Sequence, residues 1–298
     1  MIQTRLYEYM VSYTPQTQWI EKSGIKLWLA FFFIELGAGM FFVASLLDYA
    51  PAMLVGLVLC AIVGGGLHLL YLGKPLRFWR MMLSSGWKTS WISRGLFFVV
   101  FFIAFGLIHF ISIEQGDRFT PLLAAADLFA FLTVIYGGFA MNYVNGIPLW
   151  NTALLPILYV VSGFWGGAEA TLGIIIGSGK AAAGGVMEEW IRLLLIGYIL
   201  LIPVYLLSVS YTSSTGQISV RYMMLDRWSP LFWIAVVIVG MAIPSLAVVT
   251  TFLSSLGSVS MVLLYVAMFS GLIGDLAMRY LILRCGLYSP LVPSSSTL

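Results

Sequence analysis

The sequence predicts an all-α integral membrane protein with eight transmembrane helices, on three observations. The 298 residues are 61% hydrophobic and only 9% charged, whereas about a quarter of the residues of a soluble domain are charged. The protein has eight apolar runs of about the 20 residues that a helix needs to cross a bilayer. These runs lack the alternation of barrel strands, and backbone groups in lipid must be paired within their own segment. We therefore expect a helical bundle made of two four-helix halves.

The eight spans follow one another with short connections. Pro51, Pro121 and Pro230 stand at or just before span starts, where the missing N–H of proline costs nothing. Glycines within several spans let neighbouring helices approach closely. The spans are expected at residues 25–47, 51–72, 92–112, 121–144, 151–177, 190–211, 231–253 and 257–281.

An N-terminal tail at 1–24 and a C-terminal tail at 285–298 flank a single transmembrane domain at 25–284. The N-terminal tail has no apolar core of the signal-peptide type. An even number of spans places both tails on one side, and twelve of the fifteen Lys and Arg residues fall on that side. Arg118, Lys180 and Arg192 fall opposite. The positive-inside rule therefore predicts that both termini are cytoplasmic.

Residues 64–95, which we call the platform, run from the end of the second span to the start of the third and carry five of the fifteen Lys and Arg residues. Positive charge and tryptophan at interface depth suit either a partner surface or lipid headgroups. An ordinary aromatic belt with inside-positive charge is the simpler alternative. Trp150 and Asn151 open the fifth span on the same side and are expected to join the platform surface. The platform side chains in question are Lys74, Arg77, Arg80, Lys88, Trp79, Trp87 and Trp91.

Few residues suit a metal, a haem or a nucleic acid. Cys60 and Cys285 form no metal-binding spacing, and no basic run of the kind that grips nucleic acid occurs outside the platform. A haem between helices is usually held by histidine pairs at similar depth. His68 lies near the platform end of its span and His109 near the opposite end, about 20 Å apart in depth at 1.5 Å per residue. A haem held by one histidine and one methionine is the alternative, but methionine in an apolar helix is far more often a packing residue. The sequence predicts no haem and no metal.

Four segments carry a family resemblance. LHLLYLGKPLRFWR (67–80) resembles the loop after the second helix in the NrfD/PsrC family, the membrane subunits of polysulfide reductase and related quinone-linked oxidoreductases. IYGGFAMNYVNGIPLWNTALLPILYVVSGFWGG (135–167) resembles that family's fourth helix, the following turn and the fifth helix. ELGAGMFF (35–42) and RYLILRCGLY (279–288) are similar to its first helix and its ending.

The resemblance implies a quinone-binding anchor of the inner (cytoplasmic) membrane that is not catalytic alone. The quinone implied by the resemblance is menaquinone or ubiquinone. An iron–sulfur subunit of the four-cluster ferredoxin type would exchange electrons with it and connect it to a molybdopterin catalytic subunit. Docking of that partner then becomes the favoured interpretation of the platform. One alternative is a secondary transporter, but the Gly/Pro breaks in the two halves of the sequence do not fall at matching positions, as they would in a repeat-built transporter. The other is a purely structural anchor, which would not need buried ionisable residues.

The quinone site is expected around Tyr136, Glu35 and His68. A quinone needs a hydrogen-bonding group at each carbonyl and a group that exchanges protons. Glu35 and Tyr136 lie at similar depth from the platform side, roughly 12 to 15 Å at 1.5 Å per residue, and His68 lies shallower. The family uses a tyrosine on its fourth helix, and Tyr136 matches that position, whereas Glu35 is an inference from depth. The alternatives are that Tyr136 is a packing residue with its hydroxyl bonded to a backbone carbonyl, and that Glu35 is a polar contact between helices.

His109, Asp127 and Glu169 lie within a few turns of the opposite membrane edge. Ionisable groups inside a span are costly and usually face the bundle interior or water. With Glu35, these three residues are the candidates for proton transfer, although each could instead snorkel or join helices. Asp275 and Arg279, four residues apart on one helix, are expected to form a structural ion pair.

Overall fold

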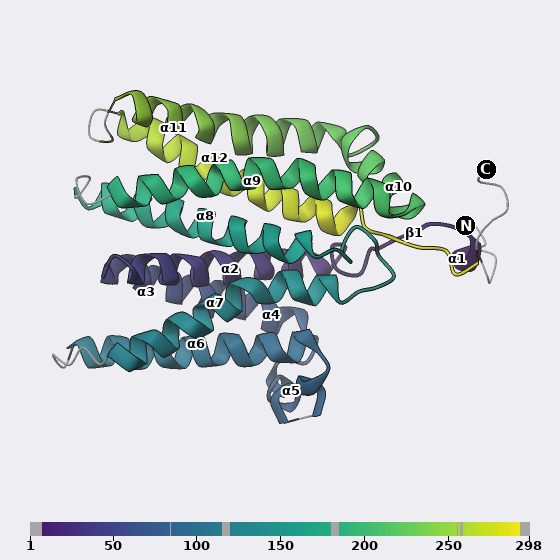
Figure 1. Cartoon of the computed structure of the whole chain (residues 1–298). Coiled ribbons are helices and arrows are strands. Elements are labelled where there is room, and N and C mark those ends of the chain that lie inside the picture. The colour runs from purple at the N-terminus through teal and green to yellow at the C-terminus, as the bar shows by residue number, and fades with distance from the viewer. Residues whose placement is uncertain are drawn as a thin grey trace.

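The computed structural model describes residues 8–83, 85–114, 120–179, 185–254, 256 and 259–292. Within this part of the protein, eight helices are long and apolar enough to cross a membrane. They lie side by side in one bundle (Figure 1), so the predicted all-helical membrane fold is confirmed. Residues 1–7 and 293–298 of the two predicted tails lie outside the described residues, as do Arg118 and Lys180 of the charge count.

The spans agree with the predicted positions to within a few residues, except at the start of the sixth. That helix begins five residues earlier than expected, because Glu188 and Arg192 in its first turns form an ion pair of 2.7 Å along the helix. Two spans contain wide π-helical turns, labelled η1 and η5. The spans are α2 (Gly24–Ser45), the continuous α3, η1 and α4 (Ala50–Val58, Leu59–Gly64, Gly65–Tyr71), α6 (Trp91–Glu114), α7 (Thr120–Asn142), α8 (Leu154–Gly177), α9 (Gly185–Thr212), the continuous η5 and α11 (Leu231–Ala242, Ile243–Leu253) and α12 (Met261–Arg284).

Helices α2 and α8 lie at the centre of the bundle and pack against each other. The continuous α3–α4 span and α7 lie around α2, and α6 packs on α7. We call α2 and these helices the first four spans. Around α8 lie α9 and α12, with η5 and α11 packed on α12; together with α8 they are the last four spans. The broad α2–α8 contact joins the two sets, and their separation into two halves stays a prediction.

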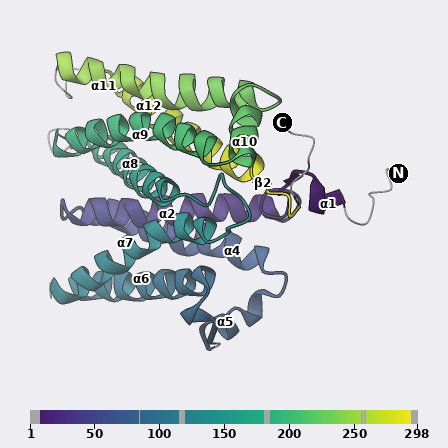
Figure 2. The same ribbon diagram turned by 45° about the vertical axis from the view of Figure 1, so that its right-hand side comes forward.

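One end of the bundle carries the short elements and both ends of the described part of the protein. Strand β1 (Thr14–Pro15) pairs antiparallel with β2 (Leu287–Tyr288). Helices α5 (Trp79–Leu83) and α10 (Ser214–Met224) lie at the same end (Figure 2). We call this end the platform face and the opposite end the far face.

Candidate functional site

A cavity of about 310 Å³ lies among the first four spans near the platform face. Its size is at the lower end of the range of about 300 to 1,000 Å³ that is usual for small-molecule sites. Its wall is almost entirely apolar, which also fits such sites. The lining residues come from the segment before α2 and from α2, the α3–α4 span, the platform, α6 and α7: Trp19, Leu27, Phe31, Ile34, Ala61, Gly65, His68, Leu69, Tyr71, Leu72, Phe78, Met81, Ile92, Gly95, Leu96, Val99, Val100, Ile103 and Tyr136.

Two of the predicted quinone ligands meet in this cavity. His68 Nε2 on α4 and the Tyr136 hydroxyl on α7 are 3.1 Å apart, a hydrogen-bonding distance. The Phe31 ring lies 5.3 Å from the His68 ring and 5.6 Å from the Tyr136 ring, between centroids. Gly95 on α6 lets the Tyr136 ring lie against the helix backbone, because a Cβ at that position would overlap the ring. The pair is therefore held in place by packing from α2 and α6.

Glu35, the third predicted ligand, lies behind the cavity wall. It is fully buried and is not one of the described residues that line the cavity. Its neighbour Ile34 does line the cavity, and its Oε1 atom lies against Gly137, the residue after Tyr136. Glu35 is thus close to the cavity wall without belonging to it.

The other oxygen of Glu35 belongs to a buried ion cluster. Arg279 Nη1 donates to Glu35 Oε2 at 2.6 Å, and Arg279 Nε donates to Asp275 Oδ2 at 2.8 Å. Arg279 Nη2 donates to the Ser162 hydroxyl at 2.7 Å, and the guanidinium lies 4.4 Å from the centre of the Tyr159 ring. We call Glu35, Asp275 and Arg279 the Arg279 cluster. Through its contacts with Ser162 and Tyr159 of α8, the cluster joins α2, α8 and α12 at the contact between the first and the last four spans.

Two buried carboxylates against one guanidinium leave a net negative charge when both are ionised. One proton on either carboxyl makes the Arg279 cluster neutral, and burial favours a neutral cluster over a charged one. The cluster can therefore hold and release one proton. The sequence predicts the pairing of Asp275 with Arg279 but not the participation of Glu35, Ser162 and Tyr159, which are distant in sequence.

The three far-face candidates do not form one group. Glu169 on α8 lines a small cavity among the last four spans, and its carboxyl group lies against Gly271 of α12. Asp127 on α7 instead interacts with the Ser45 hydroxyl at the end of α2. His109 on α6 is buried, with 4% of its surface exposed. Of the three, Glu169 is the one that faces the helix of the Arg279 cluster.

The platform is an exposed cationic and aromatic surface. Its lysines and arginines lie beside tryptophan rings at distances typical of cation–π pairs. The guanidinium of Arg80 lies 5.6 Å from the Trp79 ring centre, and the Lys88 ammonium lies 5.8 Å from that of Trp87. Lys74, Arg77, Arg80, Trp79 and Lys88 are all exposed, whereas Trp91 is half-buried and stacks on Phe139.

The two residues expected to extend the platform differ from each other. Asn151 is exposed and donates to the Asn142 carbonyl at 2.7 Å, which ties the α7–α8 turn together. Trp150 is fully buried and donates from Nε1 to the Ile282 carbonyl at 2.7 Å. The Trp150 ring therefore supports the core beneath the platform face and is not available to a partner.

Among the described residues, no group of three or more His, Cys, Asp or Glu side chains is placed to hold a metal ion. The ionisable side chains of the interior are instead arranged as hydrogen-bonding and ion-pairing groups. Together with the apolar cavity, this arrangement suits binding of an uncharged ring with two polar atoms and exchange of protons with it.

Comparison with known proteins gives one family and two relatives. Residues 22–290 match the family model described as "Polysulphide reductase, NrfD". The protein is 23% identical over 214 residues to the "Protein NrfD homolog" of Haemophilus influenzae, and the match covers 62% of this sequence and 66% of the relative. It is 25% identical over 208 residues to the C chain of the polysulfide reductase of Wolinella succinogenes, where the match covers 61% and 65%. The matched region thus spans slightly less than two thirds of the length of each of these relatives.

Proposed function

The chain belongs to the NrfD family of polysulphide reductases, and from that membership we propose that it is the quinone-reactive membrane subunit of an oxidoreductase complex. The observation that carries the proposal is the His68–Tyr136 pair, which lies in an otherwise apolar cavity. In the proposed complex, an iron–sulfur subunit of the four-cluster ferredoxin type exchanges electrons with the quinone. That subunit passes them to or from a molybdopterin catalytic subunit.

The cavity fits the ring of a quinone. Its apolar wall matches the ring faces and the start of the isoprenoid tail, and His68 and Tyr136 supply polar groups for the ring oxygens. Ile92 of the cavity wall has 44% of its surface exposed, which favours access from the lipid. Either menaquinone or ubiquinone satisfies these requirements.

The residues of the cavity have separate roles in this proposal. The Tyr136 hydroxyl donates a hydrogen bond to one quinone oxygen, and His68 hydrogen-bonds Tyr136 or the second oxygen through Nε2. Reduction of one quinone takes up two protons and two electrons, and oxidation of the quinol releases them. The electrons pass to or from the iron–sulfur partner. Glu35, with its Oε1 atom against Gly137, exchanges protons through the wall.

Substitution of Tyr136 tests the proposed site. In the purified complex, Tyr136→Phe should lower quinone-linked turnover on the order of 10²-fold, since a positioned hydrogen-bond donor to an oxygen that gains charge typically contributes about 10² or more. Glu35→Gln should lower it in the same direction. Electron transfer from an artificial dye to the catalytic subunit should stay at the level of the wild type in both.

Tyr71→Phe is the matched control, because Tyr71 lines the same cavity and has no part in the His68–Tyr136 pair. Turnover of this variant should stay near that of the wild type. Normal turnover and normal inhibitor affinity in Tyr136→Phe would show that the quinone binds elsewhere.

The proposal also assigns a partner, a membrane and an orientation. The exposed cations of the platform are the docking surface for the iron–sulfur subunit, and lipid surrounds the remaining helix faces. The protein lies in the inner (cytoplasmic) membrane with its platform face toward the cytoplasm. The excess of Lys and Arg at that face supports this orientation.

A further inference from the structure

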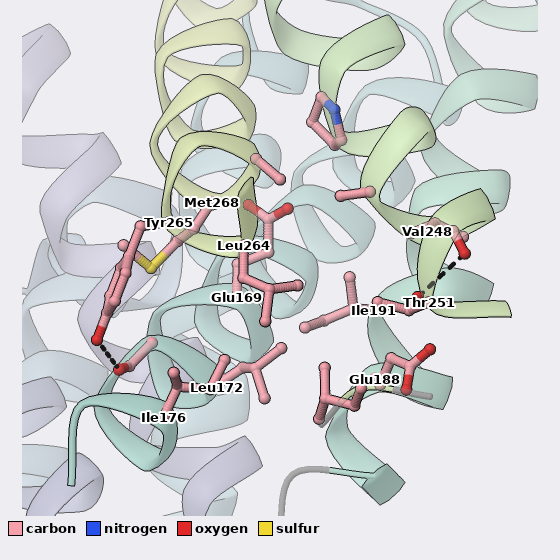
Figure 3. A pocket seen from close by; sticks show the side chains of 15 residues that line it. Glu169, Leu172, Ile176, Glu188, Ile191, Val248, Thr251, Leu264, Tyr265 and Met268 are labelled. Carbon is pink, nitrogen blue, oxygen red and sulfur yellow. Dashed lines mark hydrogen bonds between the residues drawn. The ribbon is translucent and has the colours of Figure 1, made fainter. Parts of the chain in front are cut away.

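A groove of about 480 Å³ lies in the angle between the end of α9 and α10, at the platform face. It is separate from the small cavity that Glu169 and Glu188 line near the start of α9 (Figure 3) and from the cavity of the first four spans. Its volume is within the range of about 300 to 1,000 Å³ that is usual for small-molecule sites. Apolar side chains form most of its wall, and Arg221 is the one charged residue among the described residues that line it.

Helix α10 connects the end of the sixth span to the start of the seventh and lies across the platform end of the bundle (Figure 2). Ser219 and Met223 on one side of α10 are buried, whereas Gln217 and Arg221 on the other side are exposed. Trp233, at the start of the seventh span, donates from Nε1 to a backbone carbonyl of α10 at 2.9 Å. Tryptophan is enriched at the membrane–water interface, and a helix with one polar side lies there in the plane of the membrane. We therefore place α10 at the depth of the lipid headgroups.

The polar groups of the groove suit an anion. The Arg221 side chain is 70% exposed, and its Nε atom lies 3.9 Å from Asp226 Oδ2, which is longer than a hydrogen bond. An exposed pair of this kind holds the guanidinium only weakly. Tyr211 and Gln217 line the groove with exposed side chains that can donate hydrogen bonds. A guanidinium binds a phosphate group through two parallel hydrogen bonds.

The wall that α9 contributes to the groove continues toward the middle of the membrane. Leu200, Val204 and Leu207 are each more than half exposed. With Tyr211, their spacing places them on one side of the helix. Leu200 lies 12 residues before the end of α9 at Thr212, about 18 Å deep at 1.5 Å per residue. A soluble protein that docks on the platform face does not reach this depth, whereas an acyl chain does.

We propose that the corner between α9 and α10 is a binding site for one anionic phospholipid of the leaflet at the platform face. Arg221 binds the phosphate of the headgroup, and Tyr211 and Gln217 hydrogen-bond its other oxygens. The acyl chains lie along the exposed apolar side of α9. A positive groove favours a headgroup of net negative charge, because the ammonium group of a zwitterionic lipid would meet Arg221. The site does not depend on the quinone function proposed above.

The test measures lipid binding to the detergent-purified, delipidated protein by native mass spectrometry. Dioleoyl-phosphatidylglycerol should bind at one site more tightly than dioleoyl-phosphatidylcholine. Arg221→Gln should lower the affinity for phosphatidylglycerol about fivefold, the effect of one basic residue near an anionic lipid surface, and remove most of the preference. Arg221→Lys should keep part of the preference, because the charge remains. Lys26→Gln is the matched control, since Lys26 is an exposed cation at the same face in the first turn of α2. Its affinities should equal those of the wild type.

Four outcomes would overturn the proposal. Equal affinities of the wild type for the two lipids would leave only acyl-chain contacts. An unchanged affinity for phosphatidylglycerol in Arg221→Gln would place the anionic lipid elsewhere, such as on the platform. Displacement of the lipid by an equal concentration of glycerol 3-phosphate would identify a site for a free phosphate group. Absence of the lipid from the wild-type complex purified with its partner subunits would show that a protein surface covers the corner.

A photochemical measurement locates the bound lipid. The protein is reconstituted in phosphatidylcholine vesicles that contain a small fraction of phosphatidylglycerol with a diazirine on one acyl chain. Irradiation should label α9 between residues 200 and 207, and labelling there should fall about fivefold in Arg221→Gln but not in Lys26→Gln. Labelling spread evenly over the lipid-facing sides of all the spans, or unchanged by Arg221→Gln, would contradict a site at this corner.

Discussion

At the scale of single residues, Arg279 shows how a charge is kept inside a membrane protein. Its three nitrogens donate to Glu35, Asp275 and Ser162 at 2.6 to 2.8 Å, and its flat face lies over Tyr159. A lysine lacks the planar guanidinium group and cannot donate hydrogen bonds in these three directions with the same geometry. The charge is tolerated because each of its three nitrogens has a partner.

Loss of this guanidinium should destabilise the protein strongly. Arg279→Gln leaves two buried carboxyl groups without their counter-ion, and breaking a buried pair typically costs about 3 to 5 kcal/mol. Thermal unfolding of the detergent-purified protein, followed by tryptophan fluorescence, measures the effect.

Arg284→Gln, on the same helix, is the control for Arg279. Its ion pair with Glu21 is partly exposed, so its loss should cost about 1 kcal/mol or less. Combining Arg279→Gln with Glu35→Gln and Asp275→Asn should restore much of the lost stability. Equal melting temperatures for the two arginine variants would contradict this account of the cluster.

At the scale of helices, the bundle depends on close approach at glycine pairs. In α12 and η5, a Cβ on Gly274 would overlap the Cα of Gly240, so the two backbones are in contact. Small residues at such crossings allow extensive van der Waals packing, which drives helix association in lipid. The crossing lies one residue from Asp275 and therefore also sets the position of the Arg279 cluster.

Gly274→Ala should separate α12 from η5 and lower stability by about 1 to 3 kcal/mol, the usual cost of overpacking. Gly66→Ala is the control, because a Cβ at Gly66 meets no atom within 4 Å and alanine favours the helix by about 1 kcal/mol. Melting temperatures in detergent compare the two. A Gly274→Ala variant as stable as Gly66→Ala would show that η5 can shift without cost.

At the scale of the whole molecule, the two faces of the bundle differ in charge. The platform face carries the exposed cations of residues 74–88 together with exposed aromatic rings. Surface patches that combine arginine with tryptophan are typical of protein interfaces. The arrangement suits an acidic surface on the proposed partner as well as lipid headgroups.

Reversal of charge on the platform should release the partner. The double variant Arg77→Glu and Arg80→Glu should insert normally but lose the iron–sulfur subunit during purification in detergent, because like charges then face each other. Arg221→Glu is the control, since Arg221 is exposed at the same face but lies on α10. A stable complex with the double variant would exclude the platform as the docking surface.

The proposed orientation has its own measurement. Single cysteines at Leu291 and Lys88 should react with an impermeant reagent only from the cytoplasmic side, and one at Glu189 only from the other side. The native Cys60 and Cys285 are buried and add little background. Labelling of Leu291→Cys in intact spheroplasts would reverse the assignment.

The sequence by itself determined the class of fold, the positions of the spans and the family. These follow from local properties, because a run of about 20 apolar residues must form a helix in lipid whatever its neighbours are. The pairing of His68 with Tyr136 was also predictable in part, since both lie near the same end of their helices.

Only the tertiary structure decided which residues face one another. Depth along a helix can be counted from the sequence, but rotation about its axis depends on packing with distant segments. For this reason Glu35 was expected in the cavity, yet it pairs with Arg279, 244 residues away. For the same reason Trp150 was expected on the surface and lies in the core. The grouping of Glu169 with α12 rather than with Asp127 follows from the same helix rotations.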